Sequence, residues 1–195
     1  MIVLGLTGSI GMGKSTTAQL FAEAGVPIWD ADAAVHHLYA EGGAGAEAIG
    51  SIAPGAVTAT GVDRVLLRQA ILEDAGLLTR IEALIHPLVA ADRLAFLDQA
   101  RAGGSAVALC DIPLLFETGA DAWLDKVVVV TAPGDVQRER VMKRPGMTEA
   151  AFAAILAKQV PDAEKRARAD FVIDTSQGLA PARARVRAVL EALDA

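Results

Sequence analysis

The chain has 195 residues, of which 53% are hydrophobic and 22% are charged, and its formal net charge is −6. This composition excludes a disordered chain, and its apolar runs are too short to predict a membrane span, which needs about 20 residues. The negative charge argues against nucleic acid as a partner. Cys110 is the only cysteine, so no disulfide can form within the chain, and we expect a cytoplasmic protein.

Short apolar segments alternate with helical segments along the chain, which predicts an α/β fold. The expected strands cover residues 2–6, 26–29, 106–110, 126–131 and 171–173. Continuous apolar runs of this length are typical of strands buried on both faces of a parallel sheet. Helices are expected over residues 14–24, 31–39, 63–101 and 181–193, whereas the Gly/Ala-rich stretch 41–61 yields no prediction. We therefore expect a five-stranded parallel sheet flanked by helices, with ligands at the carboxyl ends of its strands.

Residues 8–15 (GSIGMGKS) follow the first expected strand and match the phosphate-binding loop G-x-x-x-x-G-K-[ST] between a strand and a helix. Gly8, Gly11 and Gly13 allow the backbone N–H groups to curl around phosphate oxygens. The positive end of the following helix dipole favours the same anion. The loop therefore predicts a nucleoside triphosphate site.

Three side chains that follow the glycines have expected roles on the triphosphate. Lys14 reaches the β- and γ-phosphates, and the hydroxyl of Ser15 binds Mg²⁺. Thr16 adds a contact with the α-phosphate. A base-reading Asn-Lys-x-Asp motif is missing from the sequence, which argues against a GTP-dependent switch.

Asp30 and Asp32 directly follow the second expected strand. One carboxylate at such a position usually caps the next helix, and we assign this role to Asp30. The other, Asp32, is predicted to accept the proton of an acceptor hydroxyl that attacks the γ-phosphate, and Asp30 could alternatively support this carboxylate.

His86 precedes Pro87 inside the long helical stretch. A proline at this position predicts an interruption of the helix. A lone histidine there is more often a core or capping residue than a catalyst, and no cluster of His and Cys predicts a metal site elsewhere.

Asp111 closes the third expected strand, where it either lies near Mg²⁺ or binds loop amides. The residues after it, 113–117 (PLLFE), form an apolar patch that ends in a carboxylate. Such a patch suits packing on a base or on a pantetheine-like chain, and equally suits a hydrophobic core.

Residues 138–168 contain eight basic and four acidic side chains, a net charge of +4 inside a negative protein. This segment is either a solvated helix face or a cationic cover over polyphosphate. Arg140 and Arg144 are four residues apart, so we expect them on one helix face, where both can reach a triphosphate and stabilise the charge on the γ-oxygens.

In chain order, these residues resemble the dephospho-coenzyme A kinase family over nearly the whole sequence. The matching segments are 6–16 (LTGSIGMGKST), 30–32 (DAD), 81–87 (IEALIHP), 111–117 (DIPLLFE), 137–140 (QRER) with Arg144, Gln159 and 169–174 (ADFVID). The phosphate loop alone is common to many NTPases, whereas the combination is much more specific.

The resemblance implies a P-loop NTPase fold that phosphorylates the ribose 3′-hydroxyl of dephospho-coenzyme A with ATP and Mg²⁺. The nucleotide-binding core then comprises residues 1–30, 103–134 and 169–195. Residues 31–102 form a helical insert that binds the acceptor, and residues 135–168 form a mobile lid. Closure of an arginine-bearing lid is useful because water in the site would hydrolyse ATP. We expect a monomer or a weak homo-oligomer.

The residue patterns and the resemblance together predict roles for individual residues, and the resemblance itself implies those of Asp32, Arg140 and residues 11–16. The catalytic residues are Asp32, Lys14 and Arg140. ATP is bound by Gly8, Gly11, Met12, Gly13, Lys14, Ser15, Thr16, Arg140 and Arg144. The acceptor is bound by Asp32, His86, Leu115, Phe116 and Glu117, and the metal by Ser15 and Asp111.

The sequence departs from the family pattern at three places. Pro145 stands where the family usually has Asp after the arginine, and Thr175 stands where it usually has Asn. His36 and His37 occupy a helix in which we would expect an Arg. Because histidine is a weak cation near pH 7, acceptor affinity is expected to depend on pH.

Two alternatives remain at this point. The chain could be another small-acceptor kinase, acting on a nucleoside monophosphate or on shikimate. It could also be a regulatory NTP-binding protein in which hydrolysis drives a change of shape. The Asp30–Asp32 pair and the arginine-bearing segment favour a transferase.

Overall fold

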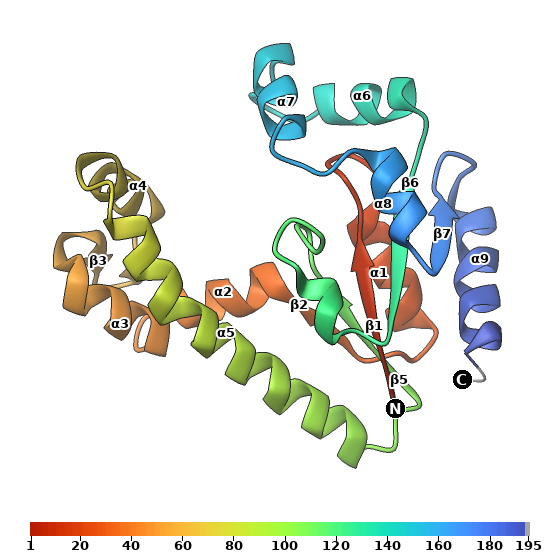
Figure 1. The fold of residues 1–195 in the computed structure, drawn as a ribbon, viewed down its shortest axis with the longest axis horizontal. Helices are drawn as coiled ribbons and strands as arrows, with labels where there is room; N and C mark the ends of the chain where they lie inside the picture. Colours follow the sequence, from red (N-terminus) through yellow and green to blue (C-terminus); the bar gives the residue numbers. More distant parts are fainter. Residues whose placement is uncertain (194–195) are drawn as a thin grey trace. The chain divides into compact units, whose positions relative to one another are not determined.

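The computed structural model describes residues 1–193 and divides the chain into two compact units (Figure 1). The first unit joins Met1–Trp29 with the chain from Ala100 onward, and the second is Asp30–Gln99. The finer division into core, acceptor insert and lid stays a prediction. Across the described residues, the structure contains no helix that is both long enough and apolar enough to cross a membrane.

The sheet of the first unit has the strand order β2-β5-β1-β6-β7. Its strands are β1 (Ile2–Thr7), β2 (Ile28–Asp30), β5 (Val107–Asp111), β6 (Lys126–Thr131) and β7 (Phe171–Asp174). β1 pairs in parallel with β5 and β6, and β6 pairs in parallel with β7. The five-stranded parallel sheet is therefore confirmed, with small shifts at the strand ends.

Alternate residues of the central strands share one apolar core with the first and last helices. Leu4 and Leu6 of β1 lie in this core with Val128 and Val130 of β6. Val129, which points to the other side, is fully buried as well. Burial on both faces explains why the strands read as continuous apolar runs. The helices of the unit are α1 (Lys14–Glu23), η2 (Ala120–Trp123), α6 (Gly134–Met142), α7 (Glu149–Leu156), α8 (Asp162–Arg168) and α9 (Leu179–Ala192).

The central place of β1 positions the phosphate loop. Leu6 is in register with Asp111 of β5, and Thr7 is in register with Val129 of β6. The loop after β1 therefore starts between the carboxyl ends of two neighbouring strands, where open parallel sheets bind their ligands.

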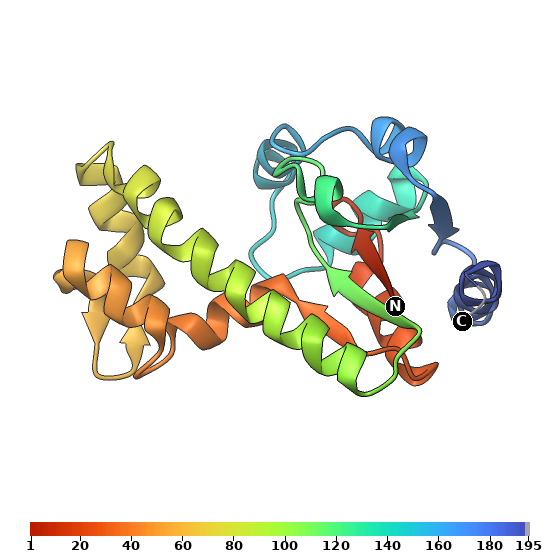
Figure 2. The ribbon, with the colours of Figure 1, turned by 60° about the horizontal axis from the view of Figure 1, so that its bottom comes forward.

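The second unit is built from helices and one short hairpin. Its elements are α2 (Ala31–Tyr39), α3 (Ala44–Ile52), η1 (Pro54–Ala56), β3 (Val57–Thr58), β4 (Gly61–Val62), α4 (Arg64–Glu73) and α5 (Leu77–Ala102), of which the last three residues belong to the first unit. The stretch that yielded no prediction thus forms a helix and an antiparallel hairpin, seen as two short arrows in Figure 2. Ile49 from this stretch is fully buried against Leu67, Ile81 and Ile85.

The expected interruption of the helix at Pro87 is wrong, because α5 runs without a break from Leu77 to Ala102. A proline inside a helix costs about 3 kcal/mol through one lost hydrogen bond and a steric clash. Ile81 and Ile85 lie in the core of the unit, 5% exposed each, and burial of such side chains contributes about 1.5–3 kcal/mol apiece. Packing of the helix therefore outweighs the cost of the proline. The break in the predicted helix lies earlier, between α4 and α5.

Candidate active site

The phosphate loop ends at a helix whose first N–H groups are open to an anion. Gly13 is the N-cap residue of α1, with φ 88°, and it offers no side chain that could cap the helix. The first N–H groups of a helix have no partner within the helix, so they are available to phosphate oxygens. Gly11 and Gly13 both adopt the left-handed conformation, at φ 79° and 88°, which residues with a Cβ rarely tolerate.

Lys14 forms an ion pair with Asp111 Oδ1. The register of β1 and β5 explains this contact, because it places the carboxyl end of β5 beside the start of the loop. The Asp111 side chain is only 4% exposed and that of Lys14 17%. The residue expected to bind phosphate and the residue expected near Mg²⁺ thus lie in direct contact.

The side chains of Ser15 and Asp111 fit a nucleotide-bound Mg²⁺ ion. Both carry oxygen donors, which Mg²⁺ prefers, and this ion usually keeps several waters while it binds one or two protein oxygens and substrate phosphates. Ser15 is exposed in the first turn of α1. Within residues 1–193, no group of three or more His, Cys, Asp or Glu side chains could hold a metal. The donor set therefore suits an ion that arrives with phosphates.

Arg140 of α6 binds the phosphate loop through Thr175. Its Nη1 donates to Thr175 Oγ1 at 2.8 Å, and its Nη2 donates to the Thr175 carbonyl at 2.7 Å. Nη1 also lies 3.4 Å from the carbonyl oxygen of Gly11. The Thr175 hydroxyl donates to the Met12 carbonyl at 2.9 Å. Thr175, which the sequence marked only as a departure from the family pattern, is thus a buried link between the arginine and the loop.

The expectation that Arg140 and Arg144 share one helix face is wrong. Helix α6 ends at Met142, and Lys143 is its C-cap. Arg144 is exposed beyond the end of the helix. It precedes Pro145, and a residue before proline is disfavoured in the α conformation. Contact of Arg144 with ATP stays a prediction without support from helical spacing.

Two glutamines bind the main chain of Ile10, inside the phosphate loop. Gln137 Nε2 donates to the Ile10 carbonyl at 2.8 Å, and the Ile10 N–H donates to Gln159 Oε1 at 3.1 Å. Gln137 lies on α6, and Gln159 follows α7. Neither residue is assigned a role from the sequence, although both belong to the matching segments. Their only signal is an amide in a basic segment, which does not reveal a contact with a loop far away in the chain.

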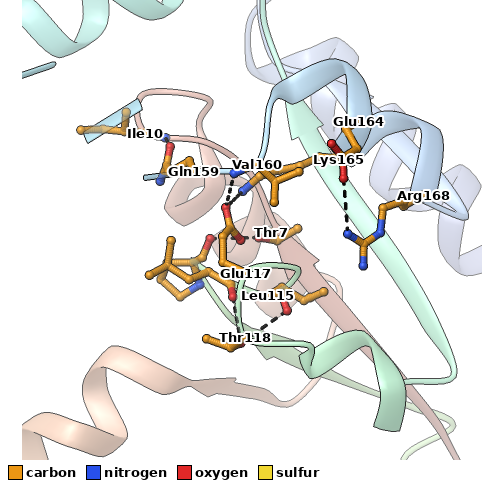
Figure 3. A network of polar contacts seen from close by, with 12 residues as sticks. Thr7, Ile10, Leu115, Glu117, Thr118, Gln159, Val160, Glu164, Lys165 and Arg168 are labelled. Carbon is orange, nitrogen blue, oxygen red and sulfur yellow. Dashed lines mark hydrogen bonds and ion pairs between the residues drawn. The ribbon is translucent and has the colours of Figure 1, made fainter. Parts of the chain in front are cut away.

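Glu117 lies in a network of polar contacts that reaches the segment of Gln159 and Val160 (Figure 3). The Val160 N–H donates to Glu117 Oε1 at 2.8 Å, and the Lys165 ammonium lies 2.8 Å from that oxygen as an ion pair. Lys165 is fully buried. Burial raises the pKa of Glu117. The Lys165 ammonium and the Val160 N–H together lower this pKa by more than burial raises it, so it lies below its ordinary value. The carboxylate is therefore stabilised in its charged form.

The two residues that precede Glu117 are buried. Leu115 is fully buried and Phe116 is 6% exposed. The guanidinium of Arg168 lies 4.2 Å above the centre of the Phe116 ring. These contacts fit the alternative of a hydrophobic core, and contact of Leu115, Phe116 and Glu117 with an acceptor stays a prediction.

Three candidates lie in the second unit. Asp30 Oδ1 accepts a hydrogen bond from the Ala33 N–H at 3.0 Å, so its role as the cap of α2 is confirmed. Asp32 is exposed in the first turn of that helix. His86 is exposed on α5. The roles of Asp32 and His86 stay predictions.

A phosphate loop between the first strand and the first helix of this parallel sheet defines a P-loop nucleotide-binding protein. The family model for dephospho-CoA kinase matches residues 2–181. The chain belongs to the dephospho-CoA kinase family, and it is a kinase.

Individual relatives support this membership. A protein of Mesorhizobium japonicum named dephospho-CoA kinase is 61% identical over 193 residues, a match that covers 99% of this chain and 97% of that protein. A crystal structure from Thermus thermophilus is similar at a TM-score of 0.81 and 34% identity, covering 98% of this chain and 97% of that one. The structure of dephospho-CoA kinase from Campylobacter jejuni is similar at a TM-score of 0.67 and 23% identity, and the match covers 98% of this chain and 96% of that one. At that identity the last comparison shows the fold alone.

Proposed function

We propose that this protein transfers the γ-phosphoryl group of ATP to the ribose 3′-hydroxyl of dephospho-coenzyme A. The products are coenzyme A and ADP, and the reaction is the last step of coenzyme A synthesis. The observation that supports it best is the uncapped N-terminus of α1, with Lys14 at its first position and Arg140 bonded to the same loop. Family membership supports the identity of the acceptor.

The donor side uses charge and position. Phosphoryl transfer needs little covalent chemistry from the protein, so aligned phosphates and matched positive charge lower the barrier. Backbone N–H groups between Gly8 and Thr16 hold the triphosphate, and Lys14 exchanges its Asp111 partner for phosphate oxygens. Mg²⁺, held by Ser15 and Asp111, would supply further positive charge at the β- and γ-phosphates.

Arg140 supplies the second cation of the donor site. Its bonds to Thr175 and Gly11 fix the guanidinium at the loop, so little reorganisation is needed before it binds γ-oxygens. Fixed donors of this kind stabilise the charge that spreads over the transferring group. Arg144 adds positive charge from the turn that follows α6.

On the acceptor side, Asp32 accepts the proton of the 3′-hydroxyl as its oxygen attacks the γ-phosphorus. A bond forms between these two atoms, the bond from the γ-phosphorus to the bridging oxygen breaks, and ADP leaves with the electron pair. The segment 31–102 holds the acceptor, with His86 and residues 115–117 among its contacts. The lid, 135–168, excludes water during the transfer.

The proposed setting is the cytoplasm, with ATP and dephospho-coenzyme A as the partners. The net charge of −6 argues against a nucleic acid partner. A membrane partner is not expected. We propose a monomer or a weak homo-oligomer.

The direct test incubates the purified protein with ATP, Mg²⁺ and dephospho-coenzyme A, and locates the added phosphate by NMR and mass spectrometry. Phosphate on the ribose 3′-oxygen is the expected result. A parallel panel contains nucleoside monophosphates and shikimate. Transfer to one of these alone would identify another small-acceptor kinase, and ATP turnover without any acceptor would favour a regulatory NTP-binding protein.

A further inference from the structure

The main chain of one phosphate-loop residue is bound from two sides by side chains outside the loop. Gln137 donates to the carbonyl of Ile10, and Gln159 accepts from its N–H. Ile10 directly precedes Gly11, where the loop turns through a positive φ. The two amides therefore fix the peptide groups on both sides of Ile10, at the entry to the part of the loop that faces phosphate.

Helix α6 also packs directly against the loop. A Cβ added to Gly11 would lie 2.5 Å from Val141 Cγ2 and 3.1 Å from the carbonyl oxygen of Gln137. Gln137 itself is 7% exposed. The close packing is independent of the hydrogen bonds, and it leaves the loop no room to move closer to α6, while the hydrogen bonds oppose movement away from it.

Gln159 lies outside any helix, so its position depends on the residues beside it. The next residue, Val160, donates its N–H to Glu117, and Glu117 is paired with the fully buried Lys165 (Figure 3). Separation of this pair is costly because it would leave the Lys165 charge buried without a partner. The Glu117–Lys165 pair therefore fixes the backbone that carries Gln159.

We propose that Gln137 and Gln159 are positioning residues that hold the phosphate loop in its nucleotide-binding shape, with the Glu117–Lys165 pair supporting Gln159. A loop that is ordered before binding spends less of the interaction free energy on ordering itself. The inference rests on the proposed function for its biological setting. Its consequence, a higher nucleotide affinity, is measurable without any acceptor.

The test compares two substitutions at each glutamine. Gln159→Glu keeps an oxygen that accepts from the Ile10 N–H, whereas Gln159→Met removes it. At the other position both Gln137→Glu and Gln137→Met remove the donor, because an ionised carboxylate only accepts hydrogen bonds. Gln159→Glu and Gln137→Glu both add one negative charge beside Ile10. A difference in nucleotide affinity between them therefore reports the hydrogen bond and not the added charge.

The affinity for a fluorescent N-methylanthraniloyl derivative of ADP, with Mg²⁺ and without acceptor, is the primary readout. We expect Gln159→Met, Gln137→Met and Gln137→Glu to weaken binding about tenfold, equivalent to about 1.4 kcal/mol. Gln159→Glu should stay within about threefold of the unsubstituted protein. In turnover assays these three variants should have a KM for ATP about tenfold higher, with kcat little changed. This pattern shows that ground state and transition state lose the same binding free energy.

Circular dichroism and thermal unfolding confirm that each variant is folded. If Gln137→Glu does not fold, the comparison of Gln159→Met with Gln159→Glu decides. Unchanged affinity in Gln159→Met, or equal losses in both Gln159 variants, would overturn the positioning role. Failure of the unsubstituted protein to phosphorylate dephospho-coenzyme A would refute the proposed function, while the binding pattern would still decide the role of the glutamines.

Discussion

Replacement of Lys165 by Met should destabilise the first unit strongly. Lys165 is fully buried, and its ammonium lies 2.8 Å from Glu117. Methionine fills a similar volume but leaves the carboxylate without its cation. Removal of one partner from a buried pair costs about 3–5 kcal/mol. We expect the lower end, about 3 kcal/mol, because Glu117 keeps the Val160 N–H and its side chain is 13% exposed.

The matched control is Lys126→Met. Lys126 pairs with Asp170 at the same distance, 2.8 Å, but the two side chains are 45% and 34% exposed. An exposed pair of this kind contributes at most about 1 kcal/mol. For a chain of this size, about 3 kcal/mol corresponds to a Tm lower by about 6–12 °C, against about 2–4 °C at most for the control.

The pH dependence gives a second readout of the same variant. Because the pKa of Glu117 lies below its ordinary value, the pair stabilises the fold above the ordinary carboxyl pKa, about 4.3. The stabilisation is lost as the pH falls through the folded-state pKa. Urea unfolding at several pH values should show a difference between Lys165→Met and the unsubstituted protein that is largest near pH 7 and shrinks below about pH 4. A cost no larger than that of Lys126→Met, or one that does not change with pH, would refute the reasoning.

Three further substitutions test residues of the candidate site, two of them for catalysis and one for stability. Lys14→Ala should lower kcat/KM by at least about a hundredfold, because a fixed donor to the transferring phosphoryl group contributes about 3 kcal/mol. A coupled ADP assay measures this loss. A loss smaller than about tenfold would exclude Lys14 as a donor to the transferring group. Asp32→Asn should leave ATP affinity unchanged and lower kcat by about 10²–10⁴-fold, so full turnover in this variant would remove Asp32 as the base. Thr175→Val should cost about 1–3 kcal/mol in urea unfolding, because Arg140 and the Met12 carbonyl each lose a hydrogen bond in a buried site. Thr175→Ser, which keeps the hydroxyl, is its control and should unfold at nearly the original urea concentration.

The features that the sequence predicted correctly depend on local patterns. Continuous apolar runs marked the central strands β1, β5 and β6, because these strands are buried on both faces. The spacing of glycines before Lys14 marked the phosphate loop, because the turn itself requires them. Asp30 was recognisable as a helix cap from its place after a strand. In each of these cases the cause lies within a few residues of the feature.

The features that the sequence did not reveal depend on contacts between distant segments. Gln159 binds a residue 149 positions away, and Lys14 binds one 97 positions away. The β3–β4 hairpin has two residues in each strand, which is too short for an alternating pattern. Local rules also gave two wrong helix boundaries. They predicted an interruption at Pro87, where α5 continues, and a helix through Arg144, where α6 has already ended.

Recognition of Ile10 through its peptide groups has a consequence for how this enzyme can vary. Gln137 and Gln159 bind the carbonyl and the N–H of the backbone at position 10. Every residue type except proline has the same two groups. These two hydrogen bonds therefore place no requirement on the side chain at position 10, whereas they do depend on the amides of Gln137 and Gln159. A library of variants at these three positions would show wide tolerance at the first and narrow tolerance at the other two.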